Sequence, residues 1–290
     1  MYNRILVPTD GSEAATAAVE AASTLARRFD AQLHGIHVVD STSTLAGADD
    51  TTGELVSRGQ EALATVDERV SDAGIDATTT LIEESTPPHR AILNYIDDHD
   101  IDLVVMGTRG RTGIGRAILG SVTENTLRRA PVPVMTIQEE TVVESPFESI
   151  LVPFDGSASA RAAADHAIEV ALATDATLYF VHVVHPGVVA GDVNARMILE
   201  ALEEAGERAL ETVIEEAASA GVETGDAPVL VGKPHREIVG FADERDIDCI
   251  VMGTHGRTGL GRLFIGSVAE RVIRQTDVPV IATRTDERDD

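Results

Sequence analysis

The strongest constraint on this chain is an internal repeat. The segment ILVPTDGS at residues 5–12 returns as ILVPFDGS at residues 150–157, and VMGT at residues 105–108 returns at residues 251–254. Three shorter phrases also return, HVV at 37–39 and 182–184, PHR at 88–90 and 234–236, and VPV at 132–134 and 278–280. The offset of 145 or 146 residues is far above the roughly 20–50 residues of a solenoid repeat. We therefore expect two duplicated domains, at residues 1–140 and 147–290, joined by a short linker.

Within each copy, strand-like and helix-like segments alternate. Short apolar runs at residues 4–9, 32–39, 77–82, 102–106 and 132–137 are typical of buried strands, and segments of helical period lie between them. Such alternation predicts a parallel sheet with helices on both faces. The expected fold class is therefore α/β, with two tandem, doubly wound, Rossmann-like open domains, each holding a five-stranded parallel sheet. Ligands bind such sheets where the strand order reverses. If the first strand neighbours the fourth, the loops that follow residues 8 and 106 meet there.

The loop after the fourth strand has the chemistry of an anion site. It reads GTRGRTGIGRAILGS at residues 107–121 and GTHGRTGLGRLFIGS at residues 253–267, with basic residues and no acid in either copy. Glycines let backbone N–H groups approach a ligand, and the Gly-Ser pair stands at a helix start, which favours phosphate. Two alternatives stay open. The glycines could only shape a turn, and Ser121 and Ser267 could cap their helices in capping boxes with Glu124 and Glu270.

Other familiar chemistries are disfavoured. No Gly-Lys-Ser/Thr follows the glycines, and no glycine triplet follows the first strand, so P-loop hydrolysis and ordinary NAD chemistry are not expected. The single cysteine, Cys249, excludes a Cys-based zinc site and is expected to be a buried, inert thiol. His37 and His182 fall inside strands and are expected to be packed or surface residues. His89 and His235 are expected to serve local structure at a helix start. We assign no catalytic residue and no metal ligand of the protein itself.

The charge balance limits the classes of partner that the chain is expected to bind. Asp and Glu number 49 against 23 Lys and Arg, a net charge of −26, which excludes a broad affinity for nucleic acid. No apolar run reaches the roughly 18 residues that a membrane span needs, and no signal-peptide pattern is present, so we expect a cytoplasmic protein. Lys233 is the one lysine. An acidic surface with so little lysine favours a halophilic origin, where salt screens self-repulsion, over an ordinary acidic protein. Its unfolding curve should then depend on salt.

The VPTDGS opening, the Gly-2x-Gly-9x-Gly-Ser loop and the closing VPV strand together resemble the universal stress protein family. The resemblance covers nearly the whole chain, twice. The chain looks like a tandem, haloarchaeal member of the ATP-binding branch, because the branch without nucleotide lacks the complete glycine loop. The resemblance implies an adenine nucleotide (ATP, ADP or AMP) at the reversal point of each copy, with Mg²⁺ or Mn²⁺ bridging its phosphates.

The resemblance also implies roles for residues. Asp10 and Asp155 would contact the adenosine moiety, although Asp10 could merely cap the following helix. The backbone of Val38 and Val183 would read the adenine edge. The full set of candidate nucleotide-binding residues is Pro8, Thr9, Asp10, Val38, Met106, Gly107, Gly110, Arg111, Gly120, Ser121, Val122 and Thr123 in the first copy, and Pro153, Phe154, Asp155, Val183, Met252, Gly253, Gly256, Arg257, Gly266, Ser267 and Val268 in the second.

The second copy departs from the first at three positions of the expected site. Phe154 replaces Thr9, His255 replaces Arg109, and Ala269 replaces Thr123. Hydrogen-bonding groups are lost or changed there, so the second site is expected to bind more weakly.

The last strands, residues 132–137 and 278–282, are apolar, and such an edge strand needs a partner. Pairing them would give an internal pseudo-dimer, which the resemblance also implies, and a homodimer of the whole chain stays open.

The function we expect is a cytoplasmic stress-response protein that binds adenine nucleotide in each repeat as a regulatory ligand. A slow ATPase or nucleotide hydrolase and a nucleotide-independent interaction module stay open as alternatives.

Overall fold

The computed structural model describes residues 1–39, 52–84, 86–110, 119–143, 147–188, 195–255 and 265–284. The chain divides into two compact units, Met1–Pro146 and Phe147–Asp290. Within the described ranges, none of the helices combines the length and the apolar character that a bilayer crossing demands.

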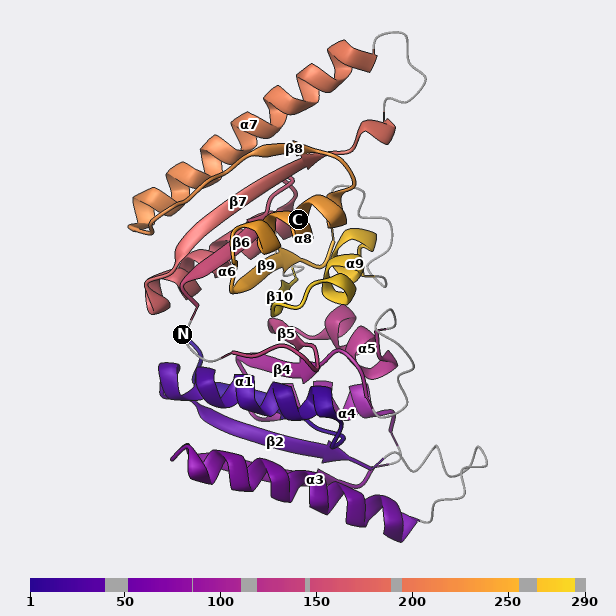
Figure 1. Cartoon of the computed structure of the whole chain (residues 1–290). Helices are drawn as coiled ribbons and strands as arrows, with labels where there is room; N and C mark the ends of the chain where they lie inside the picture. The colour runs from indigo at the N-terminus through magenta and orange to yellow at the C-terminus, as the bar shows by residue number, and fades with distance from the viewer. Residues whose placement is uncertain are drawn as a thin grey trace. The chain divides into compact units, whose positions relative to one another are not determined.

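The first unit is a parallel sheet between two pairs of helices. Its strands run in the order β3-β2-β1-β4-β5, so β1 lies between β2 and β4. Figure 1 labels β2, β4 and β5 of this sheet. Helix α1 packs against α3, and α4 packs against α5. The elements are β1 (Arg4–Pro8), α1 (Glu13–Phe29), β2 (Gln32–Val38), α3 (Thr52–Asp72), β3 (Ala77–Ile82), α4 (Pro88–Asp98), β4 (Leu103–Gly107), α5 (Ser121–Arg129) and β5 (Val134–Ile137).

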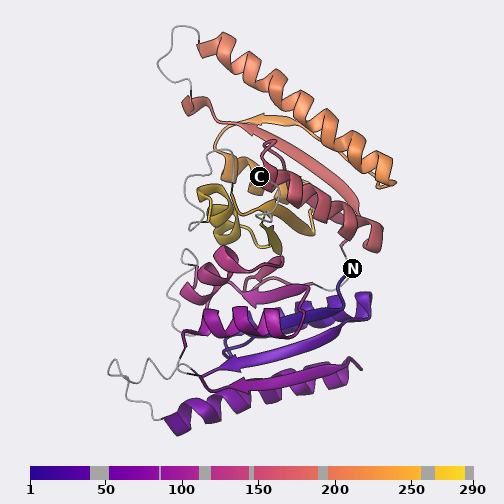
Figure 2. The same cartoon turned by 180° about the vertical axis from the view of Figure 1, so that it is seen from behind.

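The second unit repeats this arrangement, with the strand order β8-β7-β6-β9-β10. These strands are labelled in Figure 1, and Figure 2 shows the same sheet from behind. Its elements are β6 (Ser149–Pro153), α6 (Ala158–Thr174), β7 (Thr177–Val184), the 3-10 helix η1 (Pro186–Val188), α7 (Ala195–Ala220), β8 (Val229–Val231), α8 (Pro234–Glu244), β9 (Cys249–Gly253), α9 (Ser267–Gln275) and β10 (Val280–Thr283). The predicted α/β class, the parallel sheets and the first-to-fourth strand pairing are confirmed.

The first helix of each unit is positioned by the same local chemistry. The Ser12 hydroxyl accepts a hydrogen bond from the Ala15 N–H at 3.2 Å, and Ser157 caps α6 in the same way. Both helices end at an aspartate in the left-handed conformation, Asp30 and Asp175. Most of the buried residues of α1 are alanines, so the helix axis can approach the sheet closely.

The segment expected as a linker is partly anchored to the first unit. Gln138 and Thr141 are buried, and the Thr141 hydroxyl accepts from the Gln138 N–H. The Thr24 hydroxyl of α1 donates to the Val143 carbonyl at 3.0 Å. Phe147, at the start of the second unit, is only 2% exposed.

Cys249 is fully buried in β9, as predicted. Burial raises the pKa of its thiol, so the sulfur stays protonated and unreactive at neutral pH.

The stability of the second unit is expected to depend on pH through His166. Burial lowers the pKa of His166, in α6, to about 4, whereas an unfolded histidine titrates near pH 6.5. Between these values the unfolded chain binds the proton and the folded chain does not, so stability is complete above about pH 6.5 and falls towards pH 4, by up to about 3 kcal/mol. Urea unfolding from pH 7 to 4 should show this slope, and His166→Ala, which copies Ala21 of α1, should flatten it. An equal slope in the variant would contradict the prediction.

Candidate functional site

The two repeated loops meet at the point where the strand order reverses. The loop after β1 carries Asp10, and the loop after β4 carries Arg109 and Gly110. A Cβ atom added at Gly110 would come to 2.5 Å from Oδ2 of Asp10, so the carboxylate lies directly against the glycine backbone. The prediction that these loops meet is confirmed.

The aspartates do not cap the following helices. Asp10 Oδ1 accepts from the Ser12 N–H at 3.0 Å, and Asp155 Oδ1 accepts from the Ser157 N–H at 2.9 Å. These contacts close a turn that sets up the serine as the cap. One carboxylate oxygen is thus used locally, while the side chain still lines a cavity.

Glycine at the end of β4 and of β9 permits a close backbone approach. A Cβ at Gly107 would lie 2.8 Å from the carbonyl carbon of Ala14, and one at Gly253 would lie 2.7 Å from the backbone of Ser159. The first helix of each unit therefore packs directly against the strand end, and together they form the floor of the site.

The alternative that Ser121 and Ser267 cap their helices in capping boxes is wrong. The N-caps of α5 and α9 are Gly120 and Gly266, neither of which makes a side-chain cap bond. The Gly120 N–H donates to the Thr108 carbonyl at 2.8 Å, which holds the glycine extended as the N-cap, so the helix begins at Ser121, one residue earlier than a serine cap would begin it. Ser121 and Ser267 are therefore exposed first residues of their helices, where N–H groups lack partners within the helix. Glu124 pairs with Arg128 one turn on instead.

Thr123 has a structural role as well as a place in the cavity wall. Its buried hydroxyl donates to the Gly107 carbonyl at 2.8 Å and ties α5 to the end of β4. Ala269 stands at the matching position of α9. The replacement therefore removes a bond between elements of the unit.

Each unit has a cavity at this edge of its sheet, of about 320 Å³ in the first and about 430 Å³ in the second. Both fall in the range of small-molecule sites. The predicted residues that line the first are Pro8, Thr9, Asp10, Val38, Met106, Gly107, Gly110, Gly120, Ser121, Val122 and Thr123. Those that line the second are Pro153, Phe154, Asp155, Val183, Met252, Gly253, Gly266, Ser267 and Val268. Arg111, Gly256 and Arg257 lie outside the described residues.

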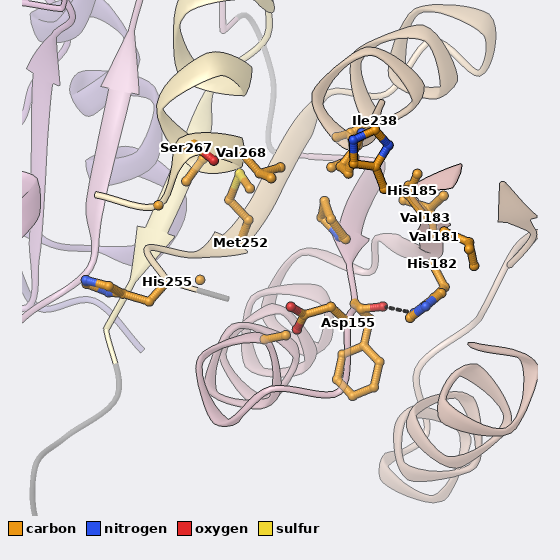
Figure 3. A pocket seen from close by; sticks show the side chains of 18 of the residues that line it. Asp155, Val181, His182, Val183, His185, Ile238, Met252, His255, Ser267 and Val268 are labelled. Atoms are coloured by element: carbon orange, nitrogen blue, oxygen red, sulfur yellow. Dashed lines mark hydrogen bonds between the residues drawn. The ribbon is translucent and has the colours of Figure 1, made fainter. Parts of the chain in front are cut away.

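In the second unit, Asp155 stands on one side of the cavity and Ser267 and Val268, at the start of α9, on another (Figure 3). One wall is polar and belongs to a helix N-terminus, where the dipole favours an anion. The strand-end wall offers the carboxylate and the backbone of Val183. This arrangement suits a ligand with an anionic end and a neutral end that hydrogen-bonds.

Sequence reasoning missed the apolar wall of each cavity. Leu55 of α3 and Pro88 and Ile92 of α4 line the first, and Leu202, Pro234 and Ile238 line the second. The repeated PHR phrase was a signal for the proline. Leu55 and Leu202 carried no signal, because an apolar residue on an amphipathic helix is usually explained by the core.

Histidine residues of the PHR phrases stay outside both cavities. The His89 Nε2 atom pairs with the Arg129 guanidinium at 3.0 Å. Burial, followed by the neighbouring Arg129, lowers the pKa of His89, and burial, followed by Arg271, lowers that of His235. Both rings are therefore neutral at pH 7, in keeping with the predicted local role.

Comparisons with known proteins cover both repeats. The model of the universal stress protein family matches residues 1–138 and 146–284. A universal stress protein of Methanocaldococcus jannaschii is 40% identical over 144 residues, which are 49% of this chain and 84% of that protein. One from Synechocystis is 25% identical over 309 residues, 97% of this chain and 99% of its own length. A crystal structure of a universal stress protein from Archaeoglobus fulgidus superimposes with a TM-score of 0.75 at 26% identity, covering 98% of this chain and 97% of that one.

Proposed function

The chain belongs to the universal stress protein family. We propose that each of its two units binds an adenine nucleotide, with ATP as the first candidate, and that this nucleotide is a regulatory ligand in a cytoplasmic stress response. The observation that carries this proposal is the same cavity in both units, bounded by an aspartate loop on one side and a helix N-terminus on the other. A nucleotide has the matching polarity, since its phosphates are anionic and its nucleoside is neutral.

In this proposal the phosphates lie at the start of α5 or α9. The N–H groups of Ser121 and Val122, with the exposed Ser121 hydroxyl, would donate to them, and Arg109 adds positive charge at the same cavity. The Asp10 carboxylate would accept from the ribose or base, and the backbone of Val38 would pair with the adenine edge. Ser267, Val268, Asp155 and Val183 would serve in the second unit.

A divalent ion would be held by the phosphates. In the described ranges, no three His, Cys, Asp or Glu side chains gather in a way that would bind a metal. Mg²⁺ or Mn²⁺ would therefore bridge phosphate oxygens, which is how Mg²⁺ commonly binds with nucleotides. Its contribution would be to neutralise phosphate charge and orient the chain of phosphates.

The second site should bind ATP about tenfold more weakly than the first. Phe154 is 2% exposed and offers no hydroxyl where Thr9 has one, and His255 replaces the permanent charge of Arg109. The loss of one hydrogen bond near a charged ligand is worth about 1.5 kcal/mol. Calorimetric titration of the whole chain should resolve two classes of site. Two equally tight sites would contradict this prediction.

The proposed function is tested by denaturing release and chromatography of any small molecule that copurifies, followed by calorimetric titration with ATP and Mg²⁺ in high salt. Up to two adenine nucleotides per chain, with turnover far slower than binding, would support a regulatory ligand. Turnover at enzymatic rates would instead favour a nucleotide hydrolase. No copurified nucleotide and no heat of binding would overturn the proposal in favour of an interaction module.

Three related expectations remain part of this proposal. If the units bind ATP as proposed, the chain belongs to the ATP-binding branch of the family. The halophilic origin predicts a free energy of unfolding that rises from low to molar salt. The internal pairing of the last strands and a homodimer of the whole chain stay predictions.

A further inference from the structure

In both units a histidine side chain binds the carbonyl at the head of the aspartate loop. Nδ1 of His37 lies 2.8 Å from the Thr9 oxygen, and Nδ1 of His182 lies 2.8 Å from the Phe154 oxygen, the bond drawn in Figure 3. Both rings are buried and both line the cavities. A carbonyl oxygen only accepts, so Nδ1 carries the proton in each ring.

This bond takes the place of a regular rung between parallel strands. The ladder between β1 and β2 continues to the bond from the Thr9 N–H to the Ile36 carbonyl, at 2.8 Å. The next rung of a parallel ladder would run from the Val38 N–H to the Thr9 carbonyl. Among the described residues, that carbonyl accepts instead from the His37 ring. The N–H of Val38 thus leaves the ladder at the residue that lines the cavity.

The second unit stops its ladder at the same rung. The Phe154 N–H donates to the Val181 carbonyl at 2.8 Å, and His182 then takes the Phe154 carbonyl that Val183 would have used. The histidine-to-carbonyl hydrogen bond is present in both units even though Phe154 replaces Thr9, because only the backbone carbonyl of that residue takes part.

A helical glycine makes room for each ring. A Cβ at Gly59 of α3 would lie 2.6 Å from the Cδ2 atom of His37, and one at Gly206 of α7 would lie 2.5 Å from that of His182. Glycine inside a helix is unfavourable relative to alanine. At both positions the imidazole needs this space, and at Gly59 the Leu81 side chain needs it as well, because its Cδ1 atom would also lie 2.6 Å from the added Cβ.

We propose that His37 and His182 are positioning residues, each of which ends the strand ladder so that the backbone of Val38 or Val183 is turned to the adenine edge of the nucleotide. This rests on the proposed function and deepens it. The histidines act through the backbone at the nucleoside end, and the phosphate end is held independently by α5 or α9.

The test compares ATP with inorganic tripolyphosphate on the full chain. The double variant His37→Phe, His182→Phe should lose at least about tenfold in ATP affinity, equivalent to about 1.4 kcal/mol, and keep its tripolyphosphate affinity within twofold. Asparagine at both positions, whose amide can donate to the same carbonyl, should restore part of the loss. Equal losses for both ligands, or none for ATP, would overturn the proposal.

His34→Phe is the matched control. His34 is also buried in β2, but its side chain lies on the opposite face of the strand and pairs with the Tyr95 hydroxyl at 3.0 Å. ATP affinity should stay within twofold in this variant. A loss as large as that of the double variant would mean that any buried histidine of the strand matters, and it would overturn the positioning role.

A second readout needs no nucleotide and guards against variants that fail to fold. Long-range ¹H–¹⁵N spectra of the unliganded wild-type chain should show His37 and His182 as the tautomer with hydrogen on Nδ1. The opposite tautomer would overturn the inference even if ATP binds. The expected tautomer in a chain that binds tripolyphosphate but not ATP would overturn the adenine role, and a chain that binds neither would refute the proposed function itself.

Discussion

Replacing Ser121 and Ser267 by aspartate should weaken ATP binding at least about 100-fold. Each carboxylate would stand at the first residue of its helix, where the phosphates are proposed to lie. Two like charges about 4 Å apart repel by about 1 kcal/mol in water and by about 4 kcal/mol near a protein surface. Several phosphate charges face the new carboxylate, so a loss of about 2.7 kcal/mol is a lower bound.

The same substitutions should not harm folding. Both serines are exposed and neither caps its helix, and a carboxylate in the first helical turn interacts favourably with the helix dipole. Urea unfolding should therefore show stability that is unchanged or slightly raised.

Two controls separate charge at the site from other effects. Ser121→Ala, with Ser267→Ala, should cost ATP affinity much less than aspartate does. Thr212→Asp adds a charge on α7 at an exposed residue that lines neither cavity, and it should leave affinity unchanged. ATP affinity that survives the aspartate pair would place the phosphates elsewhere.

Gly107→Ala should destabilise the first unit by about 1–3 kcal/mol, the usual range for overpacking a tight contact. The added methyl would lie 2.8 Å from the backbone carbon of Ala14. Backbone cannot move aside as the end of a side chain can, so α1 or β4 must shift. ATP binding in the first unit should fall as well, because both elements form the floor of its cavity.

Gly240→Ala is the matched control. Gly240 lies inside α8, and nothing comes within 4 Å of a Cβ added there. Alanine should stabilise this helix by about 0.5–1 kcal/mol. Denaturant unfolding of both variants measures the two effects, and a stabilising Gly107→Ala would show that the contact between α1 and β4 is looser than described.

The sequence predicted the fold because its signals were local and repeated. The apolar runs at residues 4–9 and 102–106 form β1 and β4. The alternation of strand-like runs with segments of helical period predicted the parallel sheet. The phrase at residues 107–121 placed the glycine loop beside the aspartate loop, because parallel strands end at the same edge of a sheet.

The same reasoning failed where one residue of register mattered. The Ser121-to-Glu124 spacing fits a capping box, but the Gly120 N–H pairs with the Thr108 carbonyl and moves the helix start. That partner lies twelve positions earlier in the chain and becomes a neighbour only after folding. Sequence reasoning missed the apolar wall formed by Leu55 and Leu202 for a similar reason. The sequence of an amphipathic helix does not show which cavity its apolar face will line.

The sequence by itself determined the duplication, the strand and helix order, and which loops carry the chemistry, because these depend on composition, period and spacing along the chain. Tertiary structure alone decided how those parts are used. In the folded chain Ser121 is exposed, and the Thr123 hydroxyl donates a hydrogen bond to the Gly107 carbonyl. The His37 ring packs against Gly59 and donates to the Thr9 carbonyl. Hydrogen bonds and steric contacts between distant segments settle these choices, because their energies depend on distances of a few tenths of an ångström that no local pattern encodes.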